Sequence, residues 1–91
     1  MEISVSDVKQ YIRVDYSEDD ALIADMISAA KKQCMDILRT DDEAVLESAK
    51  NGKLAVLFTV AYLYEHREDA DHKSLNLTLR ALLFGSREVS F

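Results

Sequence analysis

Apolar residues are densest between Leu54 and Tyr64, where Thr59 is the one polar side chain among eleven residues. At about 100° per residue, this segment predicts a helix that is apolar around most of its circumference. The first apolar side carries Leu54, Leu57, Phe58, Ala61 and Tyr62. The second side carries Val56, Val60, Leu63 and Tyr64. Between them we expect a narrow polar wedge made of Ala55, Thr59 and His66.

This apolar helix needs neighbours on most of its sides, and a chain of 91 residues has few other helices to supply them. The segment is also too short to cross a bilayer. We therefore expect other subunits to cover part of it.

Two helices are predicted before this segment. Apolar residues recur on one side over residues 5–13, and Ser4 or Ser6 can cap the start of this first helix. Ser17 and Asp20 have the spacing of a capping box, which predicts a long second helix from Glu18 to Arg39. Its apolar face covers an arc of about 160°. The residues on that face are Leu22, Ile23, Met26, Ile27, Ala30, Cys34, Ile37 and Leu38.

The other elements are short. After Thr40, residues 41–50 are predicted to form a helical turn or two that ends at Asn51-Gly52. The apolar helix is expected from Lys53 to Glu68. A polar loop is expected over residues 69–73. Leucines then recur at helical spacing up to Gly85, although the alternation of Leu75, Leu77 and Leu79 leaves open an extended start before a helix over residues 78–84.

The composition agrees with an all-α fold. Hydrophobic residues make up 48% of the chain, which has two glycines, no proline and no tryptophan. This favours a helical bundle over a disordered tail or a turn-rich sheet protein. We expect residues 1–91 to form one domain of about four helices, with one long amphipathic helix, one largely buried apolar helix and a tail over residues 85–91. The single Cys34 is interpreted as a small core residue.

The charge of the chain disfavours a role in gripping nucleic acid. Seventeen acidic residues against eleven basic ones give a net charge of −6, which repels DNA backbones and anionic lipid. The first residues lack the basic start and apolar run of a secretory signal, so a cytosolic protein is expected.

No catalytic or cofactor site is predicted. His66 and His72 lie among acidic residues, but neither has a partner one helical turn away as a two-histidine metal site requires, so a solvated acidic loop is the favoured interpretation. Acid pairs such as Asp19-Asp20 lie where helix starts attract negative charge. Lys32 is expected to pair with Asp36 at four-residue spacing.

The side of the apolar helix that carries Val56, Val60, Leu63, Tyr64 and Arg67 is a candidate for a protein interface. Tyrosine and arginine are enriched at interfaces because each combines apolar contact area with directional hydrogen bonds. The alternative is that this side packs against the chain's own first or last helix. The sequence leaves both interpretations open.

Four segments carry a resemblance to a known family. These segments are Ala61-Tyr62-Leu63-Tyr64-Glu65-His66-Arg67-Glu68, the opening residues 8–15, the stretches 20–23 and 27–30, and Leu82-Leu83-Phe84 followed by Arg87. In their order along the chain they resemble the head-tail connector proteins of long-tailed bacteriophages. The chain lacks the prolines that the family often has before its third and last helices.

The resemblance implies a structural phage or prophage protein without catalysis. Such a subunit joins a homo-oligomeric ring beneath the portal protein and above a tail-proximal head completion protein, and in isolation it can stay monomeric. Some members are labelled as DNA packaging proteins. The ring completes the head and extends a channel through which DNA passes without specific binding. The implied location is the head-tail junction of the virion, after synthesis in the host cytoplasm, with no membrane involved.

The resemblance also implies interface or structural roles for the residues that match its motif, which are Tyr64, Arg67, Leu82, Leu83 and Arg87. Together with Val56, Val60 and Leu63 they make up the predicted subunit interface. A different class of protein remains as the alternative, a small acidic helical regulator that acts as a dimer and masks a basic partner with carboxylates.

Overall fold

The structure is a computed structural model that describes residues 3–49, 51–66, 68–69 and 71–84. These residues form five helices and no strand. The helices are α1 (Val5–Ile12), α2 (Asp20–Leu38), α3 (Glu43–Ser48), α4 (Gly52–Glu65) and α5 (His72–Phe84). The predicted all-α bundle is confirmed, and the short segment before Asn51 adds a helix of its own.

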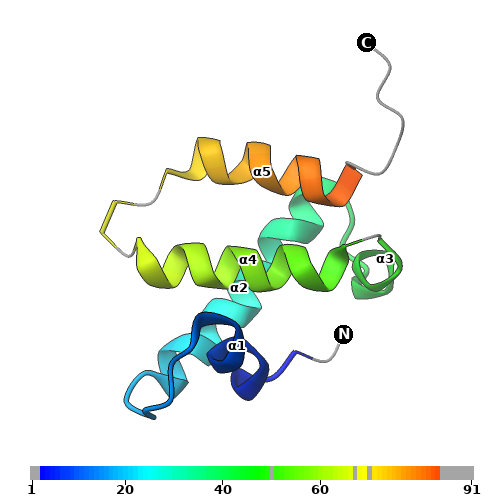
Figure 1. The fold of residues 1–91 in the computed structure, drawn as a ribbon. Coiled ribbons are helices and arrows are strands. Elements are labelled where there is room, and N and C mark those ends of the chain that lie inside the picture. Colours follow the sequence, from blue (N-terminus) through cyan, green and yellow to red (C-terminus); the bar gives the residue numbers. More distant parts are fainter. Residues whose placement is uncertain (1–2, 50, 67, 70, 85–91) are drawn as a thin grey trace.

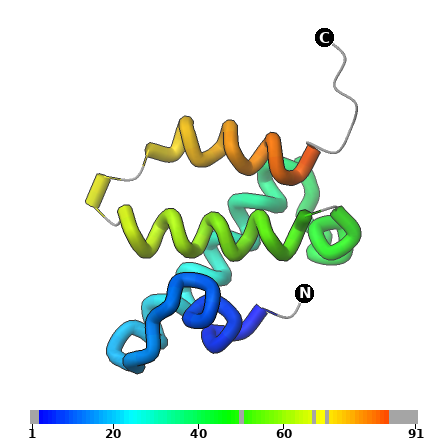
Figure 2. Tube along the Cα trace, viewed as in Figure 1, coloured from blue at the N-terminus to red at the C-terminus, as the bar shows by residue number. Residues whose placement is uncertain are grey.

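Helices α2 and α4 form the centre of the bundle, because each of them packs against the other and against α1, α3 and α5. In Figure 1, α5 runs alongside α4, while α2 crosses behind it. Helix α1 lies on the side of α4 away from α5, and α3 lies near the start of α4, as the tube in Figure 2 also shows. The long helix α2 reaches every other helix as well, so α2 and α4 together hold the bundle.

The helix starts follow the capping residues only in part. At α1, the Ser4 hydroxyl accepts a hydrogen bond from the Asp7 amide and the Asp7 carboxylate accepts one from the Ser4 amide, both at 3.1 Å. This reciprocal pair is a capping box, and the bond from the Ser4 amide lowers the pKa of Asp7. At α3, the Asp42 carboxylate accepts from the Ala44 amide at 2.9 Å.

The predicted capping box at Ser17 is wrong. Helix α2 begins at Asp20, after Asp19, and the Asp19 side chain makes no capping bond. The carboxylate of Asp19 instead accepts a hydrogen bond from the Tyr64 hydroxyl at 2.6 Å. A tertiary contact has thus replaced the local one.

Helix α4 starts at Gly52 and ends at Glu65, and α5 already begins at His72. The extended start considered for residues 75–77 is therefore wrong. Leu75, Leu79 and Leu83 are buried at four-residue spacing, while Leu77 is 62% exposed. The Asp71 carboxylate accepts from the Ser74 amide at 3.1 Å, and this bond lowers the pKa of Asp71.

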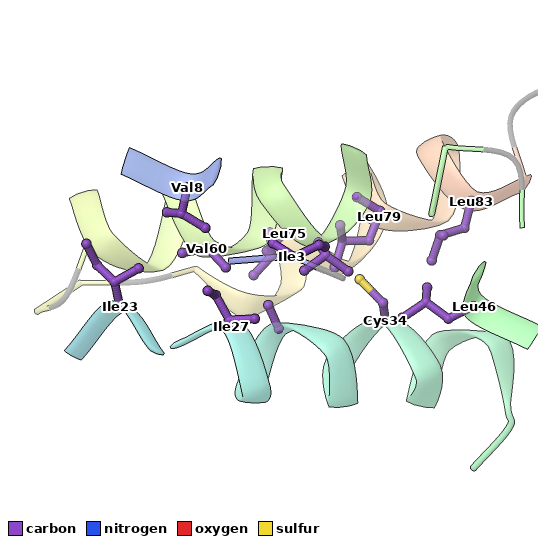
Figure 3. Close-up of a cluster of buried hydrophobic side chains, with 13 residues drawn as sticks. Ile3, Val8, Ile23, Ile27, Cys34, Leu46, Val60, Leu75, Leu79 and Leu83 are labelled. Atoms are coloured by element: carbon purple, nitrogen blue, oxygen red, sulfur yellow. The ribbon is translucent and has the colours of Figure 1, made fainter. Parts of the chain in front are cut away.

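The core draws on all five helices and on Ile3. Figure 3 shows Ile23, Ile27 and Cys34 of α2 pointing toward side chains of α4 and α5, with Leu46 of α3 beside Cys34. The predicted face of α2 is confirmed: Ile23, Ile27, Ala30 and Cys34 are buried, and its other members flank them. Burial raises the pKa of the Cys34 thiol, as expected for a core cysteine.

The predicted polar wedge of α4 is wrong for two of its three residues. Ala55 and Thr59 are fully buried, and the Thr59 hydroxyl lies 3.9 Å from the Cys34 sulfur on α2. The hydroxyl donates to the Ala55 carbonyl at 2.8 Å, so it is satisfied within its own helix. The side of α4 with the smallest residues therefore faces the core, because small side chains let helix backbones approach closely.

The opposite side of α4 is only partly covered. Leu54 is 41% exposed, and Leu57, Phe58 and Ala61 are half-buried. We call these four residues the outer stripe. The expectation that one chain cannot cover the whole apolar helix therefore applies to this side.

Three residues adopt left-handed backbone angles, namely Arg13, Arg39 and Asn51, with φ of 61°, 59° and 64°. Arg13 and Arg39 are the C-caps of α1 and α2. At this position glycine is the favoured residue because it has no Cβ to clash with the backbone.

Replacing Arg39 by glycine should raise the free energy of unfolding by about 0.5–1 kcal/mol, because it removes the strain of a left-handed residue. Urea denaturation followed by circular dichroism measures the change. Arg39→Ala is the control, since it removes the guanidinium but keeps the Cβ and should give no gain. A lower stability of Arg39→Gly than of Arg39→Ala would contradict the strain.

Gly52 starts α4 where the chain passes very close to α3. A Cβ added at Gly52 would overlap the carbonyl oxygen of Leu46, which is backbone and cannot rotate away. Gly52→Ala should therefore lower the free energy of unfolding by about 1–3 kcal/mol. Thermal denaturation measures this, with the exposed neighbour Lys53→Ala as the control. Equal stability of the two variants would show that α3 does not constrain the start of α4.

Candidate interaction surface

Three residues of the predicted interface lie inside the chain's own core. Val56 and Val60 have no exposed surface, and Leu83 is 5% exposed. Contact with another subunit through these side chains would require the bundle to open. Their packing matches the alternative in which this side of α4 meets helices of the same chain.

The next three residues of that prediction are half-buried. Leu63 and Leu82 lie at the edge of the core. The Tyr64 hydroxyl donates to the Asp19 carboxylate at 2.6 Å and lies 2.8 Å from the Tyr16 hydroxyl. The bond to Asp19 raises the pKa of Tyr64, because ionised tyrosine could not donate to it. Tyr64 thus fastens the end of α4 to the start of α2.

Arg67 and Arg87 lie outside the described residues. Contact with another subunit stays a prediction for the remaining five residues, since the structure contains one chain. These residues are Leu63, Tyr64, Arg67, Leu82 and Arg87. Among the described members, Leu63, Tyr64 and Leu82 have surface available for it.

A shallow groove continues the outer stripe toward α1. It has a volume of about 390 Å³, and its lining includes Phe58 and Ala61 of the stripe with Tyr11, which is 42% exposed. Arg13 and Glu65 line it too. An apolar centre with a charged border is the usual anatomy of a protein interface. The sequence marks this side of α4 as apolar, but it does not show that the bundle leaves it uncovered.

The end of α4 carries an acidic hollow. Glu65, Glu68 and Asp69 line it together with Tyr64, around a volume of about 640 Å³. These three carboxylates, which we call the acidic rim, make no ion pair within the described part of the chain.

The two histidines near this rim do not join it in a metal site. The His66 ring stacks on Tyr62 with a centroid distance of 4.2 Å, and its Nδ1 lies 3.0 Å from the Tyr62 carbonyl oxygen. His72 is exposed at the start of α5. Within residues 3–49, 51–66, 68–69 and 71–84, no three His, Cys, Asp or Glu side chains are grouped so that they could hold a metal ion.

A basic groove lies between α2 and α5, with a volume of about 540 Å³. Gln33 of α2 donates to Asn76 of α5 at 2.8 Å and so joins the two helices there. Lys32, Arg39 and Arg80 line the groove and supply its positive charge. The predicted pair of Lys32 with Asp36 is confirmed at 3.6 Å, between side chains that are 76% and 63% exposed. At such exposure the pair adds little stability.

The acid pairs that could suggest catalysis have structural partners. Asp20 forms an ion pair with Lys9 at 2.9 Å, Asp19 accepts from Tyr64, and Asp42 caps α3. The described helices include none that is long and apolar enough to cross a membrane. The surface features that stand out are the outer stripe, the acidic rim and the basic groove.

The comparisons agree with a role in protein assembly. A family model described as phage gp6-like head-tail connector protein matches residues 2–86. Searches of the curated proteins and of the solved structures found no match. The matched range contains all five helices, and the resemblance in the sequence is confirmed. The chain therefore belongs to the phage gp6-like head-tail connector protein family.

Proposed function

We propose that this chain is one subunit of a homo-oligomeric ring at the head-tail junction of a phage or prophage particle. The ring lies beneath the portal protein, contacts a tail-proximal head completion protein, completes the head and extends the DNA channel. The observation that carries this proposal is the match of the connector family to residues 2–86. In this role the chain needs no cofactor and works by subunit contact without catalysis.

The surface of the bundle supports assembly. The outer stripe leaves Leu54 41% exposed beside a groove that includes Phe58 and Tyr11. Burying this apolar surface against a neighbouring subunit is favourable by about 25 cal/mol per Å² before the costs of association. We therefore place the outer stripe within the subunit contact, with Leu63, Tyr64 and Leu82 as further members.

The charge of the chain supports passage of DNA without binding. A net charge of −6 per subunit, repeated around a ring, repels the phosphate backbone and discourages adhesion to the channel wall. The same charge would serve the acidic regulator considered as the alternative. The family match separates the two, because it favours a structural connector over a regulator.

Deleting the gene from the phage or prophage that carries it tests the proposed function. We expect packaged heads and complete tails that remain unjoined when the lysate is viewed by negative-stain electron microscopy. A plasmid copy of the gene should restore joined particles. Normal tailed particles in the deletion lysate would contradict the proposal.

Leu54→Glu tests the place of the outer stripe in the ring. The variant should fold, because Leu54 is partly exposed, but it should lose large oligomers in native mass spectrometry over a range of concentrations. The matched control is Leu77→Glu, which adds the same charge at the 62% exposed Leu77 on α5 and should assemble as the wild type does. Equal assembly of both variants would exclude the stripe from the contact. A wild type that forms only a stable dimer would favour the regulator.

A further inference from the structure

The basic groove carries an excess of positive charge on an acidic protein. Three cationic side chains, Lys32, Arg39 and Arg80, line it against one carboxylate, Asp36. Lys32 pairs with Asp36. Arg39 and Arg80 make no ion pair within the described residues, and both are exposed. Two guanidinium groups are thus available to an anionic partner.

Arg39 occupies its position against the preference of the backbone. Its φ of 59° is left-handed, which costs a residue with a Cβ about 1 kcal/mol relative to glycine. Within the described residues, the Arg39 side chain forms no ion pair that would offset this backbone cost. A contact outside the single subunit would account for an arginine here.

The acidic rim has the complementary charge. Glu65, Glu68 and Asp69 are unpaired in the described part of the chain and surround an open hollow. The next acid, Asp71, is already used, because its carboxylate binds the Ser74 amide at the start of α5. Carboxylates arranged around a hollow suit the planar, two-pronged hydrogen bonding of a guanidinium group.

We propose that the basic groove of one subunit receives the acidic rim of the next subunit in the ring. This inference rests on the proposed ring and names the charged surfaces that close it. The rim lies at the end of α4, whereas the groove lies between α2 and α5. Two different surfaces on one chain give a head-to-tail contact, which is the type that closes into a ring.

A second copy of the chain fits the groove better than DNA does. A chain with a net charge of −6 carries an overall repulsion toward phosphate. Each copy brings both an acidic rim and a basic groove, so every subunit supplies what its neighbour requires. Glu65 lines both the acidic hollow and the apolar groove of the outer stripe, so the rim is continuous with the apolar surface proposed for the same contact.

Charge exchange tests this pairing. The groove variant carries Arg39→Glu and Arg80→Glu, and the rim variant carries Glu68→Arg and Asp69→Arg. Each variant alone should lose association by about 100-fold or more, because every contact then sets like charges together. An equimolar mixture should assemble again, since each variant supplies the complement of the other at both kinds of contact. A chain with all four substitutions should assemble by itself.

Native mass spectrometry and analytical ultracentrifugation measure assembly, and circular dichroism confirms that each variant folds. Lys53→Glu is a charge control outside both surfaces and should assemble normally. The inference is overturned if the single variants assemble like the wild type, if the mixture fails to recover, or if the wild type forms only a two-fold dimer. It is also overturned if the groove variant loses only affinity for a duplex DNA probe. The deletion phenotype decides the proposed function separately, so the inference can fail while the connector role stands.

Discussion

The fold depends on the close approach of α4 to its neighbours. Gly52 leaves no space for a side chain against the Leu46 carbonyl of α3, and the buried Ala55 and Thr59 form a small-residue side with Cys34 of α2 nearby. The one hydroxyl in this contact is satisfied by its own helix, so its burial avoids the cost of an unpaired polar group. Because α2 and α4 pack against each other and against all the remaining helices, their close contact positions the rest of the bundle.

This packing determines which side of α4 stays partly exposed. The small residues face inward, so the larger apolar residues Leu54, Leu57 and Phe58 lie toward the outside. A chain of this size buries only about two-thirds of the surface that its unfolded form exposes. Part of the apolar surface left uncovered lies on one side of α4 and on α1, at Leu54 and Tyr11. At Arg39 the backbone is left-handed and the side chain makes no ion pair within the described residues, which is why we place it in the proposed contact between subunits.

Much of the fold could be predicted from the sequence, because the spacing of apolar residues identifies the buried face of a helix wherever its other side is polar. The apolar face of α2 and the four-residue spacing of Leu75, Leu79 and Leu83 were visible in this way. Helix α4 has no such asymmetry, and the choice of its inner side depends on side-chain size. Periodicity alone could therefore not separate Val60, which is buried, from Leu54, which is not. The capping prediction at the start of α2 was wrong for a related reason. The Asp19 carboxylate accepts a hydrogen bond from Tyr64 across the bundle, and the local sequence pattern does not show that contact.

The charged surfaces were hidden in the sequence because their members are far apart along the chain. Arg39 follows α2 and Arg80 lies on α5, and only the packing of these helices brings them to one groove. A cryo-electron microscopy map of the assembled wild-type protein tests the account most directly. The account predicts a closed ring in which the basic groove of each subunit meets the acidic rim at the end of α4 of the next. A two-fold dimer, or a ring with Arg39 and Arg80 facing solvent, would contradict it.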